Sequence, residues 1–108
     1  MTHFKIVVPT YNCVEWLPRC LDSIARQTYT DYRVCVIDDA STDSQQRPLI
    51  EDYCRRYGWL GHYNTVNQGA LYNIVHAIHA LQPQDHDVII TLDGDDWLYN
   101  SRVLSKLA

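Results

Sequence analysis

The sequence predicts an α/β protein built on a mostly parallel four-stranded sheet flanked by helices. Four apolar, strand-like runs alternate along the chain with stretches of helical periodicity. This alternation is typical of a parallel sheet with right-handed crossovers, since each helix must pack back onto the sheet before the next strand begins. Three of the four runs also end in polar or acidic residues, at the position where open α/β sheets bind their ligands.

The first strand is expected at Lys5–Pro9, and Pro9 should end its ladder because proline has no N–H to donate. Polar groups at the end of this strand come from Thr10, Tyr11 and Asn12. The first helix is expected at Glu15–Gln27 from its apolar periodicity. Its apolar face should consist of Trp16, Leu17, Cys20, Leu21 and Ile24.

The second strand is expected at Tyr32–Asp38 and runs into two adjacent carboxylates, Asp38 and Asp39. Alternation along a strand turns these side chains to opposite sides, so that one can face a pocket while the other supports the turn. The second helix should span Gln46–Tyr57, with Gly58 just past its end. Candidate N-cap residues before it are Ser41, Thr42 and Asp43.

The remaining elements follow the same alternation. A weaker strand is expected at Leu60–Thr65, and a helix at Ala70–Leu81. The fourth strand, Val88–Leu92, is apolar and therefore predicted to be buried. Ser101 should cap a last helix at Arg102–Leu107. On the third helix, the inward-facing residues should be Leu71, Ile74, Val75, Ile78 and Leu81.

The most informative stretch is the acidic cluster after the fourth strand, Asp93-Gly94-Asp95-Asp96. Clustered carboxylates repel one another, so holding them together at a strand end without a counterion is costly. Hard divalent cations such as Mg²⁺ and Mn²⁺ prefer oxygen ligands. The cluster therefore predicts a metal site at the mouth of the sheet. The alternative is an acidic turn whose side chains are solvated.

Length and composition restrict the possible functions. The chain has 108 residues, 46% of them hydrophobic, and a net charge of −4 with acids and bases interspersed. These values fit one globular domain and disfavour a nucleic-acid-binding surface. No apolar stretch is long enough to span a bilayer, and the N-terminus lacks the layout of a secretory signal. Because the four cysteines show no CxxC spacing, we expect free thiols and a cytoplasmic protein.

Five short motifs lie in a fixed order along the chain, at Val8–Asn12, Ser23–Tyr29, Val36–Asp43, Asn67–Gly69 and Leu92–Asp96. Together they resemble the N-terminal half of family 2 glycosyltransferases, which have the Rossmann-like GT-A fold. The resemblance covers nearly the whole chain. It implies an inverting enzyme that transfers a sugar from a nucleoside-diphosphate donor, with a UDP-sugar favoured, to an acceptor that the sequence does not identify.

The resemblance also implies roles for individual residues. The nucleotide pocket would be lined by Pro9, Thr10, Tyr11, Asn67 and Gly69. Asp39 would accept a hydrogen bond from the imide N–H of the base. Asp95 would approach the ribose hydroxyls, and Asp96 would hold Mn²⁺ or Mg²⁺, with Asp93 and Asp95 beside it. The metal would neutralise charge that develops on the departing diphosphate.

Two departures from the family pattern affect these expectations. The third helix opens with Ala70-Leu71-Tyr72-Asn73, where many relatives carry an Arg-Asn pair, so no arginine is available there for the diphosphate. The catalytic base and the acceptor site of the family lie beyond the metal motif, and this sequence ends about a dozen residues after it. We therefore expect residues 1–108 to be a single nucleotide-sugar-binding domain that is truncated at its C-terminus and inactive alone.

Other functions stay open at this point. A non-catalytic nucleotide-binding module would keep the same residues. A signalling receiver domain also places paired acids after an early strand, but it needs an Asp on the third strand, where this chain offers His62 and Asn64. A phosphatase of the haloacid dehalogenase type needs Gly-Thr after its second acid, whereas Trp97 follows Asp96 here.

Two groups of side chains outside the motifs carry weaker signals. His76 and His79 are three residues apart and could bind a metal, but a solvated polar face of the helix is favoured because no third ligand is evident. Trp59, Tyr63 and Trp97 could stack on a base or sugar, although roles in the core or at its rim are favoured.

Overall fold

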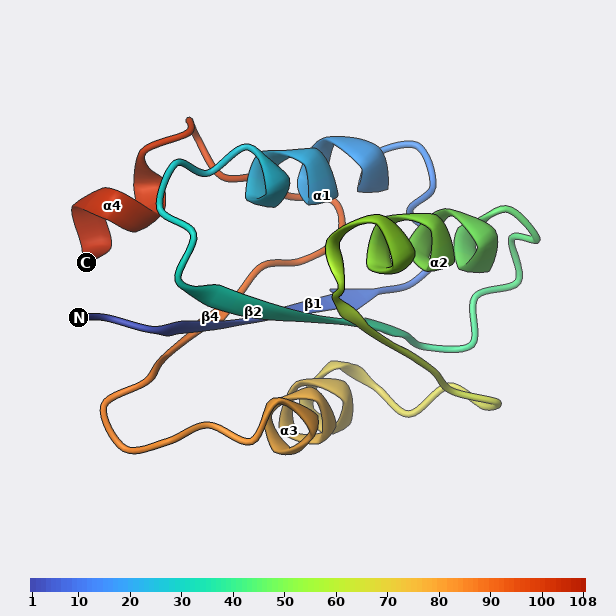
Figure 1. Cartoon of the computed structure of the whole chain (residues 1–108). Coiled ribbons are helices and arrows are strands. Elements are labelled where there is room, and N and C mark those ends of the chain that lie inside the picture. Colours follow the sequence, from blue (N-terminus) through green and yellow to red (C-terminus); the bar gives the residue numbers. More distant parts are fainter.

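A computed structural model describes all 108 residues and shows a parallel sheet between two layers of helices (Figure 1). The strands are β1 (Phe4–Thr10), β2 (Tyr32–Asp38), β3 (Leu60–Tyr63) and β4 (Val88–Thr91). The helices are α1 (Leu17–Ala25), α2 (Gln46–Tyr57), α3 (Ala70–Leu81) and α4 (Val103–Leu107). The strand order is β3-β2-β1-β4, and every neighbouring pair is parallel. The predicted fold class is confirmed.

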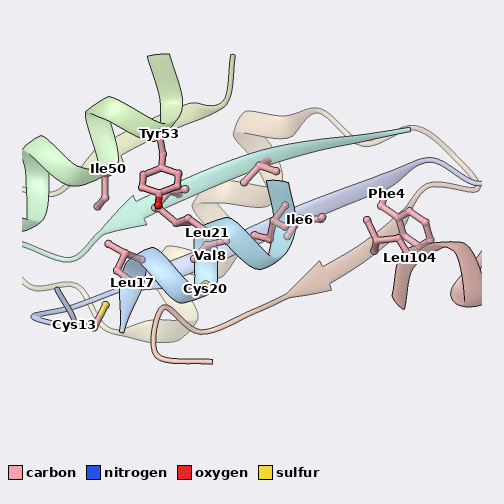
Figure 2. Close-up of a cluster of buried hydrophobic side chains, with 13 residues drawn as sticks. Phe4, Ile6, Val8, Cys13, Leu17, Cys20, Leu21, Ile50, Tyr53 and Leu104 are labelled. Carbon is pink, nitrogen blue, oxygen red and sulfur yellow. The ribbon is translucent and has the colours of Figure 1, made fainter. Parts of the chain in front are cut away.

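Alternating side chains of β1 and β2 form a separate core on each face of the sheet. Phe4, Ile6 and Val8 of β1 point to the face that α1, α2 and α4 cover, where they meet Leu21 of α1 and Leu104 of α4 (Figure 2). The opposite core is smaller and lies between the sheet and α3, which covers that face (Figure 1). It consists of Val7, Cys35, Ile37, Ala77 and Leu81. The period of two along a strand therefore builds both layers.

Local sequence explains where α2 and α3 end and why α1 can contain a proline in its first turn. Gly58 follows α2 with φ of +71°, a left-handed conformation that glycine adopts without steric cost. Gln82 takes a similar conformation after α3, and Pro83 then prevents continuation of the helix. In α1, Pro18 lies in the first turn, where its missing N–H leaves no hydrogen bond unmade.

The predicted burial of β4 is wrong for part of that strand. Val88 and Ile89 are 42% and 36% exposed. β4 is an edge strand that pairs with β1 alone, so an apolar composition does not by itself bury both of its faces. Ile90 and Leu92 do pack against the larger core.

The inward face predicted for α3 is also partly wrong. Leu71 and Val75 are exposed, whereas Asn73, Ala77 and Leu81 are buried against the sheet. Ile74 and Ile78 pack at the margin of this contact, as predicted. Apolar residues surround most of this helix, so their periodicity did not identify the face that touches the sheet.

The bounds of β1, α1, β3, β4 and α4 differ from the expected ones by one or two residues, and three expected details are wrong. β1 continues through Pro9, because the backbone nitrogen of Pro9 points toward β4 and the pairing with β4 stops at Val7, so no hydrogen bond is lost there. The carbonyl of Pro9 accepts from Gly94 N–H on the same side. Trp16 precedes α1 and is 46% exposed rather than part of its apolar face. The side chain of Ser101 does not cap α4.

No helix in the structure combines the length and the apolar composition that crossing a bilayer requires.

Candidate functional site

The carboxyl ends of β1, β2 and β4 meet at one edge of the sheet, and a cleft of about 340 Å³ opens there. Its walls come from the ends of these strands, the loop after β3, the start of α3 and the acidic motif. The lining residues are Pro9, Thr10, Tyr11, Cys13, Asp39, Asn67, Ala70, Asn73, Asp93, Gly94 and Asp95. The structure therefore brings residues from all three polar strand ends together, and of the residues expected to bind nucleotide or metal only Gly69 and Asp96 are outside the lining.

Asp38 and Asp39 have different surroundings, as alternation predicted. Asp38 is buried and holds the turn after β2, because its carboxylate accepts from Ser41 N–H at 3.1 Å and from the Ser41 hydroxyl at 2.6 Å. Thr10 Oγ1 lies 3.2 Å from Asp38 Oδ1 and 3.1 Å from the carbonyl of Ile37. These contacts make Asp38 a support for the cleft wall and not part of its lining.

Asp39 lines the cleft and also holds the loop between β3 and α3. Its Oδ1 accepts from Gln68 N–H at 2.7 Å and from the Asn64 side chain at 2.9 Å, and its Oδ2 accepts from Gly69 N–H at 3.0 Å. Burial disfavours the ionised form of Asp39, but these hydrogen bonds outweigh it, and the pKa lies below its usual value. Oδ2 keeps one acceptor position for a further donor.

The lowered pKa of Asp39 predicts a loss of stability in acid. The stability that its ionised form contributes is complete above the ordinary carboxyl pKa of 3.8 and is lost as pH falls through the lower folded-state pKa. We expect the Tm of the wild type to fall more steeply in this acidic window than the Tm of Asp39→Asn. Thermal unfolding monitored by circular dichroism across the window measures the difference, and parallel curves would contradict the role of Asp39 in holding the loop.

The loop that Asp39 holds ends at Gly69, an expected pocket residue, and is bonded to Asn73, which has no assigned role in the sequence-based prediction. Asn73 on α3 is 2% exposed, and its Oδ1 accepts from the Asn64 side chain at 2.7 Å. Gly69 has φ of +91°, a conformation that residues with a side chain rarely adopt, and α3 begins directly after it. The available signal for Asn73 was a polar amide within the mostly apolar sequence of α3.

A second polar network shapes the loop after β1. The Oδ1 atom of Asn12 accepts from Thr42 N–H and Asp43 N–H, and the buried Gln46 accepts from Cys13 N–H at 3.0 Å. The N-cap role predicted for residues 41–43 is therefore wrong, since the cap position of α2 is Gln45 without a side-chain cap bond. Asp43 instead holds the turn just before α2, because its carboxylate accepts from Gln45 N–H.

The acidic motif presents three exposed carboxylates beside the cleft. One oxygen from each of Asp93, Asp95 and Asp96 lies within 4.8 Å of the others, and none of the three forms a salt bridge. Gly94 is buried beneath them, and its N–H donates to the carbonyl of Pro9 at 3.0 Å. An exposed set of carboxylate oxygens at this spacing fits the ligand preference of Mg²⁺ or Mn²⁺.

The cleft lining contains carboxylates but no lysine, arginine or histidine. α3 opens without an arginine, and the ring of Tyr72 in its first turn stacks on His76 with centroids 5.9 Å apart. His76 in turn contacts His62 of β3 at 4.1 Å between ring centroids, so the predicted solvated face is wrong for this residue. Burial and the neighbouring His76 both lower the pKa of His62.

The aromatic residues considered for stacking have protein partners. Trp59 stacks on Tyr57 with ring centroids 5.0 Å apart, and Arg47 lies over Tyr63. The guanidinium of Arg19 lies 3.6 Å from the centroid of the Trp97 ring. None of the three candidate rings lines the cleft.

Comparison with known proteins identifies the family. The family model described as glycosyl transferase family 2 matches residues 5–108. This chain belongs to glycosyltransferase family 2. The match excludes the receiver-domain and phosphatase alternatives, and the glycosyltransferase prediction is confirmed at the level of the family.

Individual glycosyltransferases are also similar to this chain. An uncharacterized glycosyltransferase of Mycoplasma pneumoniae is 30% identical over 87% of this chain and 31% of its own length. The poly(ribitol-phosphate) beta-N-acetylglucosaminyltransferase TarS of Staphylococcus aureus is 29% identical over the whole chain and 18% of its own length. This family 2 domain thus spans less than a third of the length of either relative.

Solved glycosyltransferases share the fold. TarS residues 1–349 in complex with UDP-GlcNAc superpose with a TM-score of 0.82 at 27% identity, covering 97% of this chain and 30% of that one. The mannosyltransferase PcManGT from Pyrobaculum calidifontis, in complex with GDP-Man and Mn²⁺, has a TM-score of 0.82 at 21% identity over 95% of this chain and 30% of its own. The family 2 chain described here therefore has the GT-A nucleotide-binding architecture.

Proposed function

We propose that this chain is the donor-binding part of an inverting glycosyltransferase that binds a nucleoside-diphosphate sugar, with a UDP-sugar favoured, through Mn²⁺ or Mg²⁺. The observation that carries this proposal is the charge of the cleft. Its lining includes Asp39, Asp93 and Asp95 and no basic side chain. A diphosphate would be repelled from such a site unless a bound cation neutralised part of the charge. The carboxylates of the acidic motif supply oxygen ligands for that cation.

In this proposal the residues of the acidic motif serve the metal and the ribose of the nucleotide. Asp96 would hold the metal, Asp95 would approach the ribose hydroxyls as well as the metal, and Asp93 would complete the group of oxygen ligands. When bound, the cation acts as a Lewis acid that stabilises negative charge on the leaving diphosphate. α3 begins at Ala70 in the cleft wall, so the partially positive N-terminal end of this helix also lies at the site.

The nucleoside is assigned to the other half of the cleft. Pro9, Thr10 and Tyr11 form its wall at the end of β1, and Asn67 and Gly69 belong to the loop that Asp39 holds. The free acceptor position on Asp39 Oδ2 suits the imide N–H of uracil, because an ionised carboxylate only accepts hydrogen bonds. TarS, 27% identical to this chain, was solved in complexes that contain UDP-GlcNAc, which supports a UDP-sugar.

A titration with UDP in the presence and absence of Mn²⁺ tests the metal. We expect the affinity of the wild type for UDP to rise with Mn²⁺ and the affinity of Asp96→Asn to show no such rise, because the substitution removes a charged ligand while keeping its size. Isothermal titration calorimetry measures both. The control is Asp85→Asn, which makes the same change at an exposed site outside the cleft. Equal UDP binding by the wild type with and without Mn²⁺ would overturn the proposal.

A non-catalytic nucleotide-binding module, the alternative, would give the same titration result but would not transfer sugar. No Asp or Glu follows Asp96 in these 108 residues, so no carboxylate is available there as the base that activates an acceptor hydroxyl. We propose that this chain binds donor but does not transfer sugar by itself. Glycosyl transfer by the purified chain would contradict this part of the proposal and leave the binding role intact.

A further inference from the structure

The segment after the acidic motif is held by the end of α1. Four of its backbone groups bond to residues 23–28, although about 75 residues separate the two segments in sequence. Leu98 N–H and Leu104 N–H donate to side chains of this region, while the carbonyls of Asn100 and Ser101 accept from it. Two side chains, Ser23 and Gln27, make three of these contacts.

Gln27 bonds to three backbone groups, one of which, Leu104 N–H, is buried. It is 5% exposed, and its amide nitrogen donates to the carbonyls of Asn100 at 2.6 Å and Ser23 at 3.0 Å. Its Oε1 accepts from Leu104 N–H at 3.1 Å, in the first turn of α4, where no side chain of the helix itself provides a cap. Gln27 thus uses both of its N–H groups and its carbonyl.

Ser23 holds the chain closer to the carboxylates. Its hydroxyl donates to the carbonyl of Cys20 at 2.6 Å and accepts from Leu98 N–H at 3.0 Å. Leu98 is two residues beyond Asp96. Within the motif, Gly94 N–H is bonded to the carbonyl of Pro9. The backbone is therefore fastened to β1 at Gly94 and to α1 just after the motif, at Leu98.

The motif's own backbone is also bonded at Asp93, whose carbonyl accepts from Asp96 N–H at 2.9 Å and from Cys20 Sγ at 3.6 Å, but its carboxylates are not held directly. The side chains of Asp93, Asp95 and Asp96 are exposed and form neither hydrogen bonds nor salt bridges in the structure, so their positions depend on the backbone that carries them. We propose that Ser23 and Gln27 are positioning residues that hold the backbone of the acidic motif in the arrangement required to bind the metal. This inference rests on the metal-dependent nucleotide binding proposed above.

Substitution of the two residues tests their positioning role. We expect Ser23→Ala and Gln27→Met to weaken the binding of Mn²⁺, in the presence of UDP, by about tenfold, the usual lower range for loss of a group that orients metal ligands. The affinity for UDP in EDTA should stay unchanged, since neither residue lines the cleft. Ser23→Thr keeps the hydroxyl and should restore Mn²⁺ binding. Electron paramagnetic resonance of free Mn²⁺ measures the affinity.

Matched controls and an independent readout separate the outcomes. Ser44→Ala and Gln84→Met make the same changes at exposed positions and should bind Mn²⁺ like the wild type. Hydrogen exchange at Leu98 N–H reports whether Ser23→Ala has broken the bond, with no metal present. Wild-type Mn²⁺ affinity in Ser23→Ala overturns the positioning role, whether or not Leu98 has lost protection. A wild type without any metal-dependent UDP binding overturns the proposed function, and the positioning role with it.

Discussion

Asp39→Ala is expected to weaken the binding of UDP by roughly ten- to a hundredfold, since a hydrogen bond to a charged group contributes about 1.5–3 kcal/mol. The substitution removes the acceptor proposed for the imide N–H of the base. It also releases Gln68 N–H and Gly69 N–H, which Asp39 holds at 2.7 Å and 3.0 Å, and so loosens the loop at the cleft wall. Both effects act in the same direction.

Asp38→Ala is the matched control for this measurement. Asp38 is equally buried, but it does not line the cleft, and its carboxylate is bonded to Ser41 and to Thr10. We expect this variant to lower the Tm while its affinity for UDP stays close to that of the wild type. Calorimetric titration with UDP and CDP, together with thermal unfolding, measures both variants. If Asp38→Ala remained folded and lost UDP binding while Asp39→Ala kept it, the assignment would be reversed; tighter binding of CDP than UDP would contradict the imide argument.

Gly94→Ala is expected to destabilise the fold by about 1–3 kcal/mol, the usual cost of overpacking a core position. A Cβ atom at this position would lie 2.8 Å from Cys13 Sγ and 2.9 Å from Thr10 Cγ2, closer than such atoms approach in proteins. Both neighbours are buried, so neither can move aside freely. The backbone must shift instead, and it carries Asp93 and Asp95 on either side. We therefore expect the Mn²⁺-dependent gain in UDP affinity to disappear as well.

Urea unfolding and UDP titration with Mn²⁺ measure these two effects of Gly94→Ala. Gly61→Ala is the control, because its Cβ would also meet an atom at 2.8 Å, but that atom is the hydroxyl of the half-buried Tyr63, at the end of a side chain that can move. Adding Cys13→Ala to Gly94→Ala removes the closest clash and should recover part of the stability. A Gly94→Ala variant with wild-type stability and metal response would show that the close packing beneath the motif is not required.

The missing arginine and the charge of the cleft have a common consequence. α3 opens without the arginine that the resemblance leads one to expect, and the cleft lining contains no basic side chain. The proposed site consequently depends on a bound metal more strongly than a site that also has an arginine. Mn²⁺-dependent binding of UDP is therefore the property of this site that reports most directly on its carboxylates.

Much of the fold and the outline of the site follow from local sequence. The bounds of β2, α2 and α3 agree with the predictions, because alternation, helical periodicity and the residue after each helix act over a few neighbouring positions. The alternation of strands and helices also predicts a parallel sheet, which places the polar strand ends at one edge. The motifs themselves were sufficient to indicate the glycosyltransferase family, which the family model confirms.

Only the tertiary structure decided which apolar residues are buried and which polar groups are partnered. Leu71 and Ile89 are exposed because α3 turns Ala77 toward the sheet instead, and because β4 has a neighbouring strand on one side alone. The contacts of Asp39 with residues 64–69 and of Gln27 with residues 100–104 join segments about 25–77 positions apart. Periodicity describes only neighbours in sequence, whereas burial and hydrogen bonding depend on which segments the sheet brings together.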